Sequence, residues 1–301
     1  MHKYTLSVRS GHLYLNNTPF LVKGLRCSNA LVTNHAAEQL VRHLPVFAAY
    51  GVNTISVFLM GSRFGDVKGY LQDGTLNPFY LSRLHSILQE AHDRGMVVLV
   101  GCLYWGNSKA IYEDWTQMQA NIAIAQTVRW LAEHNFNNVM VDVDNEGMAL
   151  RNMGFDNQEL VRAGKKANSS IVIGTNFRGD PPPEADVALH FSNPAPGKPY
   201  VESEGSPDNT PGGYWGVYSK LDGLYGYRNI GVYTEAMKAH QIAVTRQHLD
   251  SGKGYLLAST WLQAPPPQGP KHFPGGNGSI DDPVVRWWLE FIRHTYGVYQ
   301  P

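Results

Sequence analysis

Hydrophobic and polar positions along the chain follow two patterns in turn. Short apolar runs rich in β-branched residues recur through the sequence, and longer segments with the period of an amphipathic helix separate most of them. This alternation favours a parallel sheet whose strands are joined by helices. The expected strands are residues 20–26, 53–59, 96–104, 138–144, 170–176, 186–192, 199–204 and 254–261. The expected helices are residues 36–50, 77–94, 112–134, 157–167, 233–250 and 283–296.

The expected strands are almost continuously apolar, which indicates burial on both faces. Eight such units within 301 residues predict a single (β/α)₈ barrel over residues 1–301, preceded by a short hairpin at about 4–20 with its turn at Asn16-Asn17. An open doubly wound sheet is the alternative, but no glycine-rich phosphate motif follows the first strand. Two connections, 178–185 and 193–198, are too proline-rich for full helices, so these crossovers should be short or irregular.

Composition and charge exclude several classes of partner. Basic and acidic residues number 25 each, and no basic run is dense enough to follow a nucleic-acid backbone. No apolar run is long enough to cross a bilayer, and the start lacks the apolar block of a secretion signal. At face value this predicts a cytoplasmic protein, or a secreted or periplasmic one if a signal precedes this sequence. The sequence carries no signal for the oligomeric state.

Cysteine and histidine usage gives no sign of a structural metal. Cys27 and Cys102 are too few for a disulfide framework and lack the spacing of metal ligands, so we interpret them as buried thiols, with a disulfide as the alternative. The twelve histidines form no metal-binding motif. No cofactor and no metal are therefore expected.

The stretch VMVDVDNEG (139–147) gathers three acids in a chain that is only 17% charged. Its spacing also matches the first half of a calcium-binding EF-hand loop, but the twelfth position, which needs a bidentate carboxylate, would be Met153. A strand end with merely solvated acids is the other simple interpretation. The remaining strand ends decide between that interpretation and a reactive site.

Two expected strands end in glutamate. The fourth ends with Asn145 and Glu146, and the seventh lies in KPYVESEG (198–205), which ends with Glu202 and Glu204. In a (β/α)₈ barrel the reacting groups lie at the carboxyl ends of the strands. A carboxylic acid that faces a carboxylate across a cleft is what cleavage of a glycosidic bond needs.

With these motifs the sequence resembles clan A of the glycoside hydrolases, the retaining (β/α)₈ enzymes that include family 5 and the catalytic domain of family 2. The Asn-Glu pair, with Asp142 four residues before Glu146, is similar to the fourth strand of the clan, and KPYVESEG is similar to the seventh. The resemblance implies hydrolysis of β-linked glycosides or polysaccharides by double displacement, with an oligosaccharide or polysaccharide as substrate. Glu146 would be the general acid/base, Glu204 the nucleophile, and Asn145 a donor to the sugar 2-hydroxyl.

The resemblance also implies further substrate contacts. Trp261 lies at the end of the eighth expected strand, where the clan often has a tryptophan under the sugar, and His190 lies at the end of the sixth. Aromatic side chains near strand ends can stack on sugars, although packing is the simpler role for each one. The expected substrate-binding residues are Asn145, His190, Trp261, Trp105, Tyr104 and Arg26.

Three features leave alternatives open. Glu202 lies on the same strand face as Glu204, so it is an alternative nucleophile. Ser56 stands where many clan members have arginine, and Arg26 and Arg63 are the two candidates to replace it. The gap between Glu146 and Glu204 is short for the clan. A catalytically inactive, carbohydrate-binding barrel is therefore the second hypothesis, and an unrelated lyase or isomerase that uses the same acids is the third.

Overall fold

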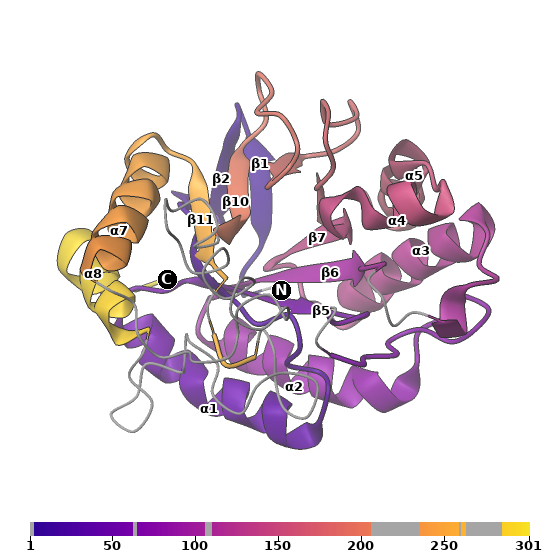
Figure 1. Cartoon of the computed structure of the whole chain (residues 1–301), viewed down its shortest axis with the longest axis horizontal. Coiled ribbons are helices and arrows are strands. Elements are labelled where there is room, and N and C mark those ends of the chain that lie inside the picture. Colours follow the sequence, from indigo (N-terminus) through magenta and orange to yellow (C-terminus); the bar gives the residue numbers. More distant parts are fainter. Residues whose placement is uncertain (1–2, 63–64, 106–109, 206–234, 259, 263–284) are drawn as a thin grey trace.

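A closed barrel of eight parallel strands forms the centre of the molecule (Figure 1). The computed structural model describes residues 3–62, 65–105, 110–205, 235–258, 260–262 and 285–301. Each strand pairs with the next along the chain, and β11 pairs with β4 to close the barrel, which confirms the (β/α)₈ fold. The strands are β4 (Lys23–Arg26), β5 (Thr54–Phe58), β6 (Val97–Leu103), β7 (Val139–Asp144), β8 (Val172–Thr175), β9 (Val187–Leu189), β10 (Tyr200–Gly205) and β11 (Gly254–Leu257).

Helices cover the outside of most of the barrel (Figure 1). They are α1 (Asn34–Ala49), α2 (Pro78–Asp93), α3 (Gln117–Glu133), α4 (Met148–Met153), α5 (Asn157–Ala167), α7 (Glu235–Asp250) and α8 (Arg286–Tyr296). Their caps follow from the sequence: Thr33 accepts from the backbone of α1, Asn77 caps α2 with Pro78 in its first turn, and Thr116 forms a capping box with Gln119 of α3.

The structure differs from the expected helices in two places. α3 begins at Gln117, not at residue 112, because the Thr116 cap fixes the start, and residues Ala110–Tyr112 form a separate 3₁₀ turn. The short helix α4 was not expected. No helix lies within residues 176–186 or 190–199, which is what the prolines there predict.

A small antiparallel sheet precedes the barrel. Strands β1 (Leu6–Arg9) and β2 (His12–Leu15) form the hairpin, and β3 (Thr18–Pro19) pairs with β2. The hairpin turn is at Ser10-Gly11, both with positive φ, so the expected turn at Asn16-Asn17 instead joins β2 to β3. The Leu6 amide donates to the Asn137 carbonyl just before β7, at 2.8 Å. This sheet therefore contacts the amino-terminal end of the strands.

Both cysteines are buried free thiols, so the disulfide alternative is excluded. Burial raises the pKa of Cys27 and of Cys102 to about 12, which leaves both as unreactive packing groups. Within the described part of the chain, no helix is both long enough and apolar enough to span a membrane.

Candidate active site

Two glutamates and a histidine from different strand ends meet at the carboxyl end of the barrel. Glu146 follows β7, His190 follows β9, and Glu204 lies in β10. One carboxylate oxygen of each glutamate and one ring nitrogen of His190 all lie within 4.8 Å of one another. These three residues lie up to 58 positions apart in the sequence and at the ends of separate strands, and the fold brings them together.

The backbone at two of these residues is strained. Glu146 has φ 53° and ψ 20°, and His190 has φ 39°. The other described non-glycine residues with positive φ are Ser10, Asn16 and Asn135, which are small polar residues of the kind that favours turns. A glutamate and a histidine in the left-handed region need support from their surroundings, and such strain is concentrated at functional sites.

Arg26, at the end of β4, holds one glutamate of the site. Its side chain is fully buried, its Nη2 atom forms an ion pair with Glu204 Oε2 at 3.1 Å, and Nη1 donates to the Ser203 carbonyl at 3.2 Å. Nη2 also donates to Asn145 Oδ1 at 2.9 Å, and the guanidinium lies 4.7 Å from the centre of the Phe58 ring. Arg26 therefore provides the cation beside Glu204 although position 56 is serine. Arg63, the other candidate, lies outside the described residues.

Glu202 lies one layer below Glu204 and is fully engaged in hydrogen bonds. Its Oε1 atom lies 2.6 Å from His190 Nδ1 and accepts from the Glu204 amide at 3.0 Å, while Oε2 accepts from the Tyr200 hydroxyl at 3.3 Å. Burial is the largest single influence and opposes ionisation of Glu202, but the hydrogen bond and charge of His190, together with the bond from the Glu204 amide, outweigh it and hold the pKa of Glu202 below its ordinary value. Burial also opposes ionisation of His190 and lowers its pKa. The hydrogen bond and charge of Glu202 act in the other direction, so that the pKa of His190 lies above its ordinary value. The two form an ionised pair.

The aspartates of β7 lie beneath the site and are both buried. Asp144 accepts from the amides of Ala149 and Leu150 at 2.8 and 3.0 Å and from Asn157 Nδ2 at 3.1 Å. It thus accepts from two backbone amides in the first turn of α4 and bridges the turn that carries Glu146. Asp142 accepts from Asn176 Nδ2 at 3.1 Å, and burial raises its pKa to about 7. These contacts give both aspartates a supporting role.

The glutamate pair concentrates negative charge in a partly buried place. Burial, with Glu146 adding to it, raises the pKa of Glu204, and Arg26 opposes that rise. Because Arg26 contacts Glu204, its charge favours the ionised form of that residue. Glu146, His190 and Glu204 are the only described group spaced to hold a metal ion, and the Arg26 charge beside them disfavours a cation.

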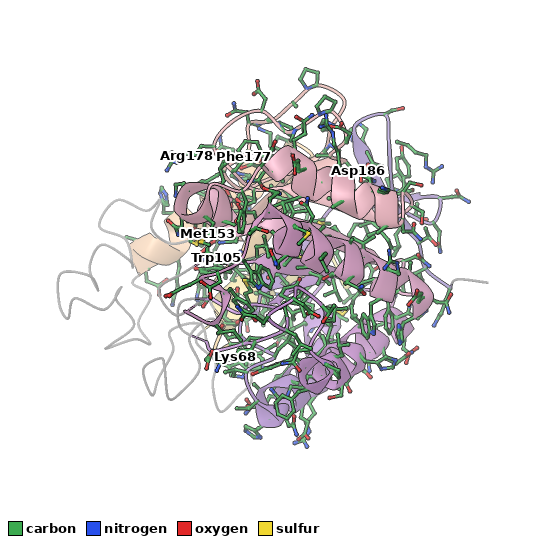
Figure 2. The ribbon with its side chains drawn as sticks, turned by 90° about the vertical axis from the view of Figure 1, so that its right-hand side faces the viewer. Lys68, Trp105, Met153, Phe177, Arg178 and Asp186 are labelled. Atoms are coloured by element: carbon green, nitrogen blue, oxygen red, sulfur yellow. The ribbon has the colours of Figure 1, made fainter. Side chains whose placement is uncertain are left out.

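The aromatic residues expected to bind sugar lie in other surroundings. Trp105 packs against the rings of Tyr112, Trp115 and Phe155, and only 6% of it is exposed. Tyr104 is buried edge-on against Phe58, with ring centres 6.1 Å apart. Figure 2 shows Trp105, Met153 and Phe177 on one side of the molecule, and Asp186, which precedes β9, lies away from them. A sugar-binding role for Trp105 and Tyr104 stays a prediction.

Trp261 is directed to helix α1. Its indole N–H donates to Gln39 Oε1 at 3.0 Å, and its ring packs on His43 and Phe47 with centres 5.1 and 6.2 Å apart. These contacts account for the position of the indole without a ligand. Its expected place under a sugar also stays a prediction.

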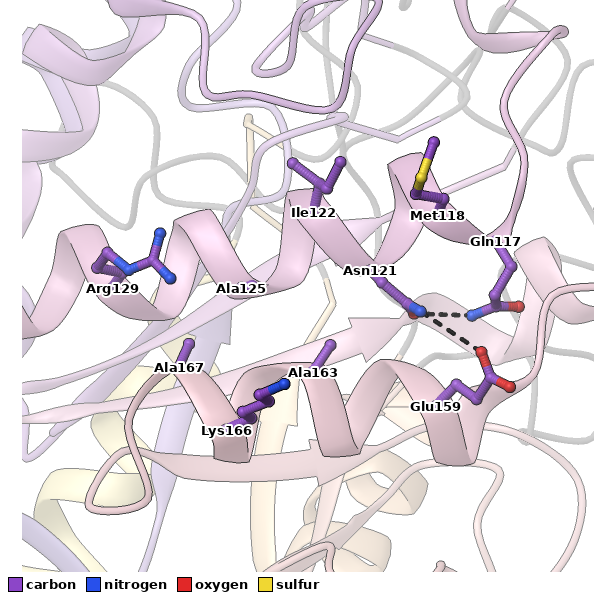
Figure 3. Close-up of a pocket in the computed structure, with 10 residues that line it drawn as sticks. All are labelled: Gln117, Met118, Asn121, Ile122, Ala125, Arg129, Glu159, Ala163, Lys166 and Ala167. Atoms are coloured by element: carbon purple, nitrogen blue, oxygen red, sulfur yellow. Dashed lines mark hydrogen bonds between the residues drawn. The ribbon is translucent and has the colours of Figure 1, made fainter.

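An open groove on the outer surface lies between α3 and α5 (Figure 3). Asn121, one of the lining residues, accepts from Gln117 Nε2 at 2.9 Å and donates to Glu159 Oε2 at 3.4 Å. The groove is lined by Gln117, Met118, Asn121, Ile122, Ala125, Arg129, Glu159, Ala163, Lys166 and Ala167. None of the site residues described above contributes to it.

Comparison with known proteins places the fold in a class. No protein-family model and no curated protein matches the sequence. Solved structures do match, and they show that the chain has the barrel fold of the family 5 glycoside hydrolases of clan A.

Three of these structures illustrate the likeness. An endo-1,4-β-mannanase from Rhizomucor miehei superposes with a TM-score of 0.60 at 10% identity over 98% of this chain and 99% of its own. A family 5 mannosidase from the same organism gives 0.60 and 10% over 98% of each chain. An endocellulase from Pyrococcus horikoshii, in a complex with cellotetraose, gives 0.55 and 13% over 97% and 98%. At such identities the likeness establishes the fold alone.

Proposed function

We propose that this chain is a retaining glycoside hydrolase that cleaves β-linked glycosides or polysaccharides by double displacement. The observation that carries the proposal is that a carboxylate oxygen of Glu146 and one of Glu204 lie within 4.8 Å of each other. Retaining glycosidases hold their two carboxyl groups about 5 to 5.5 Å apart, whereas inverting enzymes need about 6.5 to 9.5 Å to fit a water between them. The short separation therefore supports retention.

The proposed reaction has two steps. Glu204 attacks the anomeric carbon while Glu146 gives its proton to the departing glycosidic oxygen, so that the C–O bond breaks and a glycosyl ester forms. Glu146 then takes a proton from water, and that water attacks the anomeric carbon and releases Glu204. The Arg26 ion pair supports this assignment, because it stabilises a negative charge on Glu204. No metal or organic cofactor takes part in this chemistry.

Glu202 is less suited to the attack than Glu204. Both of its oxygens accept hydrogen bonds from neighbouring groups, and its charge is balanced by His190. In this proposal Glu202 orients His190, whose ring lies beside both reacting carboxyl groups. His190 can then contact the substrate or the nucleophile.

The structural neighbours suggest a substrate class. They include mannanases and an endocellulase, and one of them holds cellotetraose. We therefore propose a β-linked oligosaccharide or polysaccharide as substrate, with Asn145 as a donor to a sugar hydroxyl.

Amide variants test the assignment. Glu146→Gln and Glu204→Gln should each lower kcat/KM on the best of a panel of 4-nitrophenyl β-glycosides by orders of magnitude, because each removes a group that reacts. Glu38→Gln, an exposed glutamate on α1, is the control and should keep full activity. Proton NMR of the first-formed sugar should show retention of the β-configuration. Unchanged rates in both amide variants, or an inverted product, would reject the proposal.

Azide distinguishes Glu204 from Glu202. In Glu204→Ala, azide should replace the missing carboxylate and give a glycosyl azide of inverted configuration, whereas in Glu146→Ala it should give one of retained configuration. An inverted azide product from Glu202→Ala would transfer the nucleophile role to Glu202. Binding of oligosaccharides without turnover of any glycoside would favour the inactive carbohydrate-binding barrel instead.

A further inference from the structure

A chain of buried hydrogen bonds runs below the proposed catalytic pair. It begins at the Phe191 amide, which donates to Asn176 Oδ1 at 3.3 Å. Asn176 Nδ2 donates to Asp142 Oδ2 at 3.1 Å and to Asn145 Oδ1 at 3.3 Å. Asn145 Oδ1 also accepts from Arg26 Nη2 at 2.9 Å. Asn145 and Asn176 are both buried side chains.

The chain fixes the orientation of two side-chain amides. The backbone N–H of Phe191 can only donate, so Asn176 must present its oxygen there and its NH₂ group to Asp142 and Asn145. Asn145 receives donors from both Arg26 and Asn176, so it must present its oxygen to them. If the Asn145 amide were rotated, its NH₂ group would face the donors of Arg26 and Asn176. In a buried site this arrangement costs more than a lost hydrogen bond in water.

These hydrogen bonds leave the Asn145 NH₂ group with a fixed direction and without an acceptor among the described residues. With its oxygen committed, Asn145 must turn its NH₂ group away from Arg26 and Asn176. This Nδ2 atom is buried and has no acceptor among the residues that the structure describes. A buried N–H next to the proposed acid/base Glu146 calls for an acceptor from outside the protein, and a sugar hydroxyl is such an acceptor.

We propose that Asn176 is a positioning residue for the reaction: it holds the Asn145 amide so that Nδ2 donates to a hydroxyl of the bound sugar. This inference rests on the proposed glycosidase function and goes beyond it. The described hydrogen bonds of Asn176 go to Asp142, Asn145 and Phe191, and none goes to a proposed reacting glutamate. Its effect on catalysis passes through Asn145, so its loss should weaken recognition of one hydroxyl and leave the rest of the site in place.

A double-mutant cycle tests this inference. Asn145→Ala, Asn176→Ala and the double variant are assayed with the best aryl β-glycoside and with its 2-, 3- and 6-deoxy analogues. Asn145→Ala should lower kcat/KM on the full substrate by about 100-fold, as for loss of a donor made in the transition state. Asn176→Ala should lower it by about 10-fold or more alone and by less than 2-fold in the Asn145→Ala background. On one deoxy analogue both single variants should differ little from the original protein.

Two further variants separate positioning from general destabilisation. Asn138 is also a fully buried asparagine, at the other end of β7, and it donates to the Met96 carbonyl at 2.6 Å. Asn138→Ala should lower the melting temperature without changing the ratio of full to deoxy substrate. Asn176→Asp keeps the volume and the acceptor for Phe191 but loses the NH₂ donors, so it should show the same loss of selectivity as Asn176→Ala. It replaces Asn176→Ala in the test if that variant does not fold.

The outcomes are distinct. Additive effects of Asn145→Ala and Asn176→Ala, or unchanged selectivity in Asn176→Asp, would overturn the positioning role while the amide variants of Glu146 and Glu204 still upheld the glycosidase proposal. No hydrolysis by the unchanged protein would overturn the proposed function itself. Loss of hydroxyl selectivity in both Asn145 and Asn176 variants, without additivity, would support the inference.

Discussion

The buried Asp142 should make stability depend on pH in a way that one substitution removes. Burial raises the pKa of this carboxyl from 3.8 to about 7, and Asn176 only partly opposes the rise. Between these two values the folded protein holds a proton that the unfolded chain has lost, so the free energy of unfolding falls as pH rises from about 4 to about 7. Each tenfold change in proton affinity corresponds to about 1.4 kcal/mol, so the fall that Asp142 causes is about 4 kcal/mol.

Asp142→Asn replaces the titrating group by a neutral one of similar shape. The Asp144 amide donates to Asp142 Oδ1 at 3.2 Å and Asn176 donates to Oδ2 at 3.1 Å, so an asparagine, whose NH₂ group takes the place of one oxygen, loses one of these bonds. The lost bond costs about 1 to 3 kcal/mol at every pH. The variant should therefore be the less stable protein at pH 4 and should gain on the original as pH rises, until it equals or exceeds it above pH 7.

Urea unfolding followed by tryptophan fluorescence at half-unit steps from pH 4 to pH 8 measures this difference. Other groups that titrate in the same range, Asp144 among them, are present in both proteins and largely cancel in the comparison. The difference in unfolding free energy should change by about 4 kcal/mol over the range. Parallel curves for the two proteins would show that Asp142 is ionised in the folded state and would refute the argument.

Two other substitutions test the support of the glutamates. Arg26→Met removes the cation that lowers the pKa of Glu204, so the acidic limb of the kcat/KM profile should move to higher pH and kcat should fall; an unmoved limb would show that Arg26 does not act on Glu204. Gly147→Ala places a Cβ 2.8 Å from Phe177 Cβ at φ +61°. It should lower the free energy of unfolding, measured with urea, by more than Gly154→Ala does. Gly154 has φ +73° and open space around the added Cβ, so there the left-handed backbone alone costs about 1 to 2 kcal/mol. Equal losses in the two variants would rule out crowding against Phe177.

The barrel could be predicted from the sequence because its strands are buried on both faces. Each is a short, nearly uninterrupted apolar run, and the helices between them have apolar positions at helical spacing. The short helix α4 escaped prediction because it has only six residues and is held by Asp144, not by a long amphipathic pattern. The start of α3 was placed too early because the apolar period continues through Tyr112, while the Thr116 cap decides the boundary.

The candidate site could be predicted to the extent that the residues proposed to carry its chemistry lie at strand ends. Glu146, Glu204 and Arg26 all lie at or next to strand ends, and a parallel barrel brings such positions to one face. Asn176 could not be found in this way, because a lone asparagine after β8 has no motif and its importance arises from contacts across the barrel. A strand-end position also does not fix the direction of a side chain. The sequence therefore placed Trp261 near the rim of the barrel but did not predict that its indole turns toward α1.

The left-handed backbone at Glu146 and His190 has a consequence for attempts to make this protein more heat-resistant. Such a conformation costs on the order of 1 to 3 kcal/mol for each of these residues and nothing comparable for glycine. Selection for folded protein alone would therefore reward glycine at both positions and discard a carboxyl group and an imidazole. Engineering at this rim needs a screen for turnover alongside one for thermal tolerance, since the two goals conflict there.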